Sequence, residues 1–175
     1  MKHFLCTLFK SPRQLAFLLF LASVVGTAYA LFLQHGMGLE PCPMCIFQRI
    51  GLWTMGGFSL LFALINPKKL WAQLLLWTGS LLGIGWAFGV ALRHVWLQKF
   101  PDPMASCGPG LDFWLQTMPL ADILQLILSG SADCGVIDWE FMGLSIPMQS
   151  GIFFGLLLVI HGILVRLLFK QRTSA

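Results

Sequence analysis

Residues 14–34 read QLAFLLFLASVVGTAYALFLQ, an apolar run without a charged side chain. A helix needs about 20 such residues to cross the hydrocarbon core of a bilayer. Three more apolar runs follow, at about 46–65, 70–92 and 141–165. Because a backbone inside lipid must satisfy its own hydrogen bonds, each run is expected to be a helix. The sequence therefore predicts an all-α integral membrane protein, an antiparallel bundle of four transmembrane helices.

The composition of the 175-residue chain agrees with a single membrane domain over residues 1–175. Hydrophobic residues make up 57% of the chain and charged residues 10%, whereas a soluble domain has about 25% charged residues. Ala28-Tyr29-Ala30 resembles a signal-peptide cleavage site. The apolar run before it is too long for a signal peptide, however, and three more spans follow.

The positions of lysine and arginine predict the orientation of the bundle. Basic residues gather before the first span, between the second and third, and after the fourth: Lys2, Lys10, Arg13, Lys68, Lys69, Arg166, Lys170 and Arg172. All seven acidic residues lie in the other two connections, at about 35–45 and 93–140. We therefore expect both termini in the cytoplasm and both acidic loops on the outer side.

The second outer loop contains a short amphipathic stretch. Its apolar residues Leu120, Ile123, Leu124 and Ile127 follow helical spacing. The stretch is too short to cross a bilayer, so we expect a short helix lying in the membrane interface. A loop helix packed on the bundle is the alternative.

Four of the five cysteines lie in the outer loops, Cys42 and Cys45 in the first and Cys107 and Cys134 in the second. Outside the cytoplasm thiols meet an oxidising environment, in which disulfides persist. Four cysteines allow three pairings. A Cys42–Cys45 bond forms easily between near neighbours, which leaves Cys107–Cys134. Cys6, near the N-terminus, has no role that we can assign.

Three interpretations of these cysteines remain open. Structural disulfides suit the second loop, where closing 28 residues would stabilise the fold by about 3–4 kcal/mol, but a ring as small as Cys42–Cys45 removes little chain entropy. A four-cysteine zinc site would need a second closely spaced pair, and Cys107 and Cys134 are far apart in sequence. Cys-x-x-Cys pairs are associated with tuned thiol pKa values and disulfide exchange. We favour the redox interpretation and expect no metal.

A cation accompanies the Cys-x-x-Cys pair. Pro43 disfavours a helical Cys42, so the second helix is expected to begin near Met44 or Cys45, where a helix N-terminus favours a thiolate. Arg49 follows four residues later, on the same helix face and one turn deeper. An ionisable residue inside a span is a functional-site hypothesis by default, although arginine this close to the surface can also extend back to the headgroups.

The electrons of a dithiol need an acceptor. The sequence has no motif for a flavin or a haem, and Ile46 rather than histidine follows Cys45. A lipid-soluble two-electron acceptor such as a quinone could reach Cys45 from within the bilayer. Arg49 could then donate hydrogen bonds to a quinone carbonyl and stabilise the charge that develops on reduction.

An ordered set of motifs resembles the bacterial disulfide bond formation protein B (DsbB) family. The motifs are Gln34-His35, Pro41-Cys42-Pro43-Met44-Cys45-Ile46-Phe47-Gln48-Arg49, the approach from Pro101 to Cys107, Asp133-Cys134, Trp139-Glu140-Phe141-Met142-Gly143-Leu144, and Pro147. The similarity covers essentially the whole chain.

The resemblance implies a multi-pass protein of the bacterial inner membrane with its active site on the periplasmic side. It implies an enzyme, a protein-dithiol:quinone oxidoreductase, that reoxidises a periplasmic thioredoxin-like oxidase of the DsbA type. The electrons would pass to ubiquinone or menaquinone, which sustains disulfide formation in periplasmic proteins.

Roles for single residues follow from their places in the family motifs. Cys107 resembles the cysteine that forms the mixed disulfide with the partner, and Cys134 resembles its resolving mate, which then exchanges with Cys42. Cys45 resembles the thiolate that contacts the quinone. Two further residues match quinone-site positions, Arg49 and, with less support from the residues themselves, His94.

Two other functions remain alternatives. In the vitamin K epoxide reductase family, also four-helix and quinone-linked, we expect the loop cysteine pair first and the membrane-edge Cys-x-x-Cys in a later helix, the reverse of the order found here. A non-enzymatic membrane scaffold with two structural disulfides is the second alternative. Replacing Cys45 with serine separates these cases, because a scaffold would keep its function.

Overall fold

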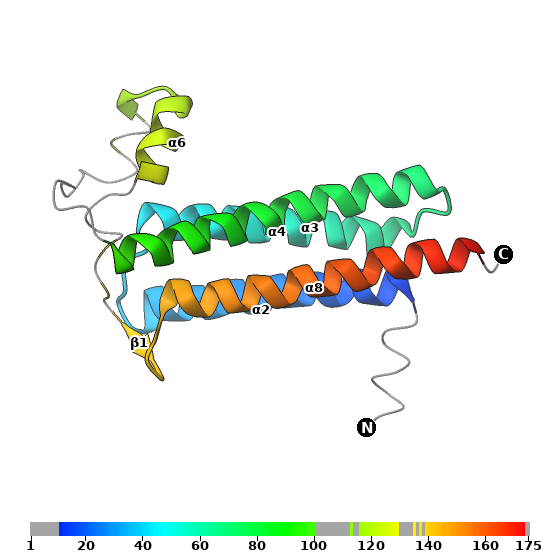
Figure 1. The fold of residues 1–175 in the computed structure, drawn as a ribbon, viewed down its shortest axis with the longest axis horizontal. Coiled ribbons are helices and arrows are strands. Elements are labelled where there is room, and N and C mark those ends of the chain that lie inside the picture. The colour runs from blue at the N-terminus through cyan, green and yellow to red at the C-terminus, as the bar shows by residue number, and fades with distance from the viewer. Residues whose placement is uncertain are drawn as a thin grey trace.

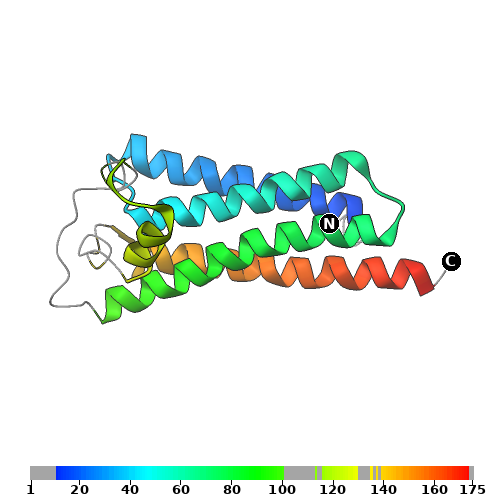
Figure 2. The same cartoon turned by 90° about the horizontal axis from the view of Figure 1, so that it is seen from above.

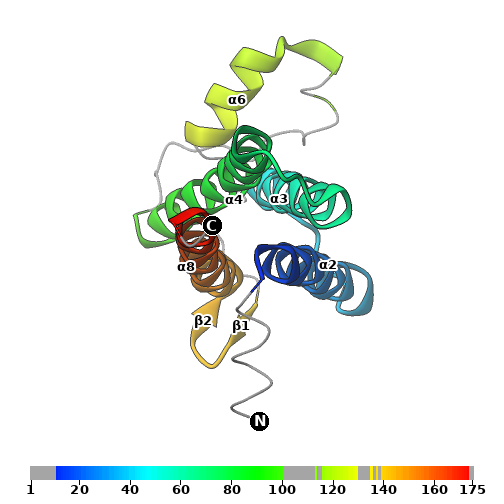
Figure 3. The same cartoon turned by 90° about the vertical axis from the view of Figure 1, so that its right-hand side faces the viewer.

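Four long helices run side by side in the computed structural model, which describes residues 11–100, 113, 116–129, 135, 137 and 139–173. They are α2 (Pro12–Gly36), α3 (Pro43–Ile65), α4 (Leu70–Lys99) and α8 (Ile146–Thr173) (Figure 1). Each is long and apolar enough to cross a membrane. Seen along the bundle, they follow one another around a ring in the order α2, α3, α4, α8 (Figure 3). The predicted all-α four-helix membrane bundle is confirmed.

The two ends of the bundle differ. The start of α2 and the end of α8 lie together at one end (Figures 1 and 2). The opposite end, called the outer end below, carries Cys42, the short helix α6 (Leu120–Ser129) and a two-stranded sheet of β1 (Glu140–Phe141) and β2 (Leu144–Ser145). This arrangement agrees with termini on a common side of the membrane, and which side that is stays a prediction.

The helices extend beyond the apolar runs at the outer end. Helix α3 begins at Pro43, close to the predicted start near Met44 or Cys45 and three residues before the apolar run. Cys42 is its extended N-cap, with φ −64° and ψ 161°. Helix α4 continues to Lys99, seven residues past the predicted span. That extension keeps His94 on the helix.

A tight hairpin, which the apolar pattern did not indicate, precedes α8. The strands pair Glu140 with Ser145 and Phe141 with Leu144. The two residues between them have positive φ, 53° at Met142 and 73° at Gly143, as a two-residue turn of type I′ requires. Helix α8 therefore begins at residue 146 and not at about 141.

The amphipathic stretch in the second outer loop is confirmed as helix α6. Ile123 and Ile127 are buried and pack with Met44, Val90 and Leu97 on the outer end of α3 and α4. The opposite side, with Asp122 and Gln125, is exposed. The helix thus packs on the bundle through one face, and a position in the membrane interface stays a prediction.

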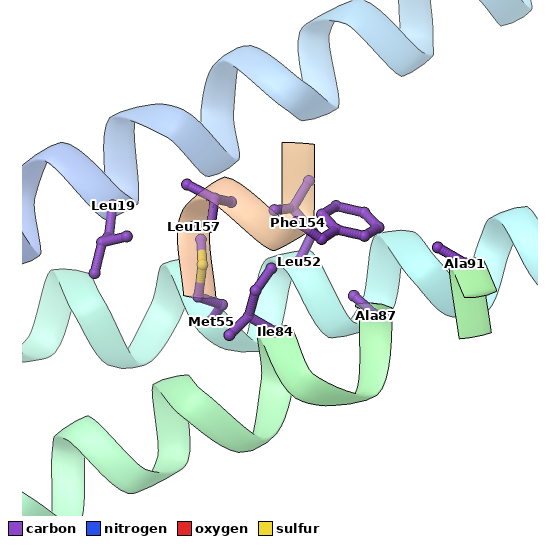
Figure 4. Packing of buried hydrophobic residues seen from close by; sticks show 8 residues of the cluster. All are labelled: Leu19, Leu52, Met55, Ile84, Ala87, Ala91, Phe154 and Leu157. Carbon is purple, nitrogen blue, oxygen red and sulfur yellow. The ribbon is translucent and has the colours of Figure 1, made fainter. Parts of the chain in front are cut away.

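The central core joins all four long helices (Figure 4). Its buried members are Leu19, Leu52, Met55, Ile84, Ala87, Ala91, Phe154 and Leu157. Large apolar side chains are also exposed on every long helix, including Val25, Leu64, Leu82 and Leu156. Exposed apolar surface on this scale is unusual for a soluble protein and is what lipid would cover.

A buried polar cluster also links three of the helices. The side chains of Ser59 and Ser80 lie 2.9 Å apart, oxygen to oxygen, and Ser80 Oγ lies 2.8 Å from His161 Nε2. All three residues are buried. His161 is therefore a packed residue, and such hydrogen bonds between helices are common in membrane bundles.

Glycines bring α3 and α4 into backbone contact. A Cβ atom on Gly83 would lie 2.6 Å from the backbone nitrogen of Met55 and 2.8 Å from the carbonyl oxygen of Gly51. Gly83 thus allows the close packing of α4 against α3. The close contact between α3 and α4 depends on Gly51 and Gly83. Gly85 and Gly89 take no part in it, since they face open space.

Alanine at position 83 is expected to destabilise the bundle by about 1–3 kcal/mol, because the added methyl group overlaps backbone that cannot move aside. The matched control is Gly85→Ala on the same helix, where the methyl group meets nothing within 4 Å. There the better helix propensity of alanine should leave stability unchanged or raise it by up to about 1 kcal/mol. Unfolding in mixed micelles measures both. Equal stability of the two variants would contradict the packing described.

Candidate functional site

The thiol pair lies at the first turn of α3. Cys42 is the N-cap and Cys45 is the third residue of the helix, and their sulfur atoms are 3.1 Å apart without a disulfide bond. Both side chains are half-buried. The first turn contains no acidic residue. The positive end of the helix dipole and the backbone N–H groups of the first turn lie beside this pair.

His94 reaches the same place from α4. Its side chain is buried, with Nε2 3.8 Å from Cys42 Sγ. The other ring nitrogen, Nδ1, lies 3.4 Å from Gln48 Nε2. The structure therefore brings His94 next to Cys42, the sulfur at the helix cap, and close enough to exchange a proton with it after a small movement.

A row of hydrogen-bonded polar side chains, called the polar chain below, contacts the Nδ1 side of the His94 ring. Ser150 Oγ of α8 donates to Gln48 Oε1 at 2.9 Å and lies 3.1 Å from the carbonyl oxygen of Pro147. Gln48 is buried inside the bundle. The chain thus runs from Cys42 through His94 and Gln48 to Ser150, across three helices. We did not single out Ser150 from the sequence, and the only signal was a polar residue within an apolar run.

Arg49 lies one turn below Cys45 and is held by α2. Its NH1 donates to Gln34 Oε1 at 2.7 Å and its NH2 to the carbonyl oxygen of Ala30 at 3.2 Å. The guanidinium group is partly buried between the helices. Its hydrogen bonds to α2 fix its position, and Gln34 is a further site residue that the sequence reasoning did not identify as its partner.

These side chains share one cavity of about 410 Å³, within the range of small-molecule pockets. Its polar lining includes Cys42, Cys45, Gln48, Arg49, His94 and Gln34. Its apolar lining includes Val25, Leu33, Leu52, Ile146, Phe153 and Phe154. Helices α2 and α8, which pack against each other less closely than the other neighbouring pairs of long helices do, form two of its walls. The result is a mostly apolar chamber with thiols and a cation at its edge.

The outer rim of the cavity is held by hydrogen bonds between α2 and the hairpin end of α8. Tyr29 donates its hydroxyl to Gln149 Oε1 at 3.1 Å, and Gln149 Nε2 donates to the carbonyl oxygen of Leu144 at 2.8 Å. Trp139 also lines this rim. The hairpin that the apolar pattern did not indicate thus helps to shape the site.

Three predicted positions lie outside the described residues. Cys107 and Cys134 belong to the second outer loop and Cys6 to the N-terminal segment. Their pairing and roles therefore stay predictions. Among the described residues, the structure brings together Cys42, Cys45, Arg49 and His94 around the one cavity.

Comparison with known proteins agrees with this site. The model of the family "Disulfide bond formation protein DsbB" matches residues 12–164. A "Disulfide bond formation protein B" of Psychrobacter sp. (strain PRwf-1) is 51% identical over 164 residues, which cover 93% of this chain and 96% of that protein. Proteins of the same name from Psychrobacter cryohalolentis and Acinetobacter baylyi are 55% and 48% identical, covering 85% and 86% of this chain and 86% and 88% of their own lengths. The chain belongs to the DsbB family of disulfide bond formation proteins.

Proposed function

We propose that this protein reoxidises a DsbA-type thiol oxidase of the periplasm and passes the electrons to a membrane quinone. Membership of the DsbB family makes the protein an oxidoreductase of disulfide bond formation. Its four long apolar helices make it a multi-pass membrane protein. The observation that carries the finer proposal is the common cavity. It joins a Cys-x-x-Cys pair, a buried histidine and an arginine within an apolar chamber at the end of four membrane helices.

Thiol–disulfide exchange would carry two electrons from the partner to the Cys42–Cys45 pair. A partner thiolate attacks Cys107 of a Cys107–Cys134 disulfide and releases the Cys134 thiolate, which attacks Cys42 of a Cys42–Cys45 disulfide and releases the Cys45 thiolate. The second partner thiol then displaces Cys107 and leaves the partner oxidised. Cys107 attacks the Cys134–Cys42 bond, which restores Cys107–Cys134 and leaves Cys42 and Cys45 reduced. The partner's two electrons now reside on the pair at α3.

Each site residue has a task in this scheme. The helix N-terminus favours Cys45 as the thiolate that is released. His94, beside Cys42 Sγ, can take up or return the proton of that thiol. Arg49, fixed by Gln34 and Ala30, presents a positive charge one turn below Cys45. A guanidinium held in advance by the fold stabilises developing negative charge without reorganising during the reaction.

The cavity fits a quinone headgroup. Aromatic and aliphatic side chains, including Phe153, Phe154 and Leu52, supply apolar walls for a flat ring. Arg49 and His94 supply nitrogen atoms at the cavity edge for its carbonyl oxygens. When bound, a quinone would accept the two electrons and two protons of the dithiol. The cavity volume of about 410 Å³ lies within the range of small-molecule sites.

A reconstituted assay tests the proposal. The full-length protein in detergent, at catalytic concentration, is mixed with an excess of reduced DsbA-type partner and a short-chain ubiquinone. We expect one quinone reduced for each partner disulfide formed, followed by quinone absorbance and by partner thiol content. Partner oxidation without quinone reduction, or no oxidation of the partner, would overturn the proposal. The same assay with a menaquinone analogue decides between the two quinone classes.

A further inference from the structure

We propose that the reduced form of this protein binds one thiophilic divalent cation of the Zn²⁺ class between Cys42, Cys45 and His94. The two sulfur atoms and a ring nitrogen of His94 all lie within 4.8 Å of one another. They come from a Cys-x-x-Cys turn and from a neighbouring helix. The proposed site is inhibitory, not a resident cofactor site, and is independent of the quinone proposal.

The ligand spacing is close to that of a tetrahedral zinc site. With Zn–S of about 2.3 Å and Zn–N of about 2.0–2.1 Å, neighbouring ligand atoms lie roughly 3.4–3.8 Å apart. Here the two sulfur atoms are 3.1 Å apart, and Cys42 Sγ is 3.8 Å from His94 Nε2. A small rotation of the cysteine side chains therefore makes room for the ion. Two sulfur ligands and one imidazole leave a fourth position, which the cavity can supply with water.

The polar chain behind His94 matches what a metal-bound histidine needs. With the ion on Nε2, the proton resides on Nδ1 and requires an acceptor. A 180° flip of the Gln48 amide places its oxygen toward His94 Nδ1, at the present contact distance of 3.4 Å. The same flip places its NH₂ group toward Ser150 Oγ, at the present contact distance of 2.9 Å. Ser150 can then donate to the carbonyl oxygen of Pro147 at 3.1 Å. Every donor and acceptor in the chain keeps a partner.

Charge balance also favours the site. Binding of M²⁺ to the two sulfur atoms as thiolates, with release of the protons that the thiols still carry, leaves a neutral metal–dithiolate unit. The apolar chamber therefore gains no net charge, although the Arg49 guanidinium lies one turn away. Only the dithiol can bind in this way, because the sulfur atoms of a disulfide are not thiolates. A bound ion would hold the pair reduced and keep it from exchange.

Cadmium titration of the full-length chain tests the site. We would use the variant Cys6→Ser/Cys107→Ser/Cys134→Ser, so that Cys42 and Cys45 are its only thiols, reduced with a phosphine in detergent. Cd²⁺ should bind with one ion per chain, with sulfur-to-cadmium charge-transfer absorbance in the ultraviolet and release of protons on binding. Zn²⁺ in excess should compete with Cd²⁺ for the site and lower this absorbance. Absence of the charge-transfer band, or binding that survives oxidation of the pair, would overturn the proposal.

Variants decide whether the histidine is a ligand. His94→Asn should weaken Cd²⁺ binding by at least about tenfold, and Gln48→Leu by about 10- to 100-fold, as expected for loss of an outer partner. The matched controls are His35→Asn, at an exposed histidine of α2, and Gln73→Leu, whose amide bonds the Pro67 carbonyl near the start of α4. Both should bind like the parent. Equal affinity of His94→Asn and the parent would overturn the three-ligand site.

The metal-binding test and the quinone assay can succeed or fail independently of each other. Metal affinity is read from absorbance and proton release without any quinone, and quinone reduction is measured on metal-free protein. Failure of one measurement therefore leaves the other intact.

Discussion

Replacing Cys45 with serine is expected to abolish electron transfer from the partner to quinone. A hydroxyl cannot form the Cys42–Cys45 disulfide, so the two electrons have no route from the outer loop to the cavity. Loss of an activated nucleophile typically lowers turnover by more than about 1,000-fold. Quinone absorbance in the reconstituted assay measures this effect, with the variant first shown to be folded by its unfolding curve in micelles.

The control for this variant is Cys6→Ser, which removes a thiol for which we propose no role. It should turn over at the parental rate. Retention of quinone reduction by Cys45→Ser would contradict the proposed route and would favour a structural role for the cysteines.

Replacing Arg49 with glutamine is expected to raise KM for the quinone by about 10- to 100-fold. The change removes a positive charge beside Cys45 and charge-assisted hydrogen bonds worth about 1.5–3 kcal/mol. Lysine at this position should recover only part of the loss, because it cannot reproduce the planar fork that here donates to both Gln34 and Ala30. Steady-state kinetics over a range of quinone concentrations measure the change.

Arg93→Gln is the matched control for this charge. Arg93 also lies near the outer end of the bundle, on α4, but it does not line the cavity. Its removal should leave KM for the quinone within about twofold of the parent, because this charge lies outside the cavity lining. If the two variants had the same KM, Arg49 would have no specific role in the cavity.

Local patterns predicted the fold and the centre of the site. Apolar runs of about 20 residues are a strong signal for membrane helices, and all four predicted helices were found. The Cys42, Cys45 and Arg49 group could be predicted as well, because its geometry depends only on helix spacing within one segment. His94 was predicted as a site residue only from the resemblance to the DsbB family. Its closeness to Cys42 depends on the packing of α4 against α3, which local patterns do not give.

Contacts between distant segments could not be predicted in the same way. Gln34 binds Arg49 from α2, and Ser150 bonds Gln48 from α8. These pairings depend on the rotation and depth of each helix, which packing sets and hydropathy does not. The hairpin before α8 was also missed, because its two-residue turn uses positive φ at Met142 and Gly143 within a stretch that the apolar pattern assigned to the fourth span.

The most direct test of the account is a single-turnover reaction of the Cys42–Cys45 pair alone. A Cys107→Ser/Cys134→Ser variant is fully reduced, freed of reductant and mixed with one equivalent of a soluble ubiquinone. The account predicts that one quinone is reduced per chain while Cys42 and Cys45 become a disulfide, seen as loss of two alkylatable thiols. An unchanged quinone, with both thiols still open to alkylation, would contradict it.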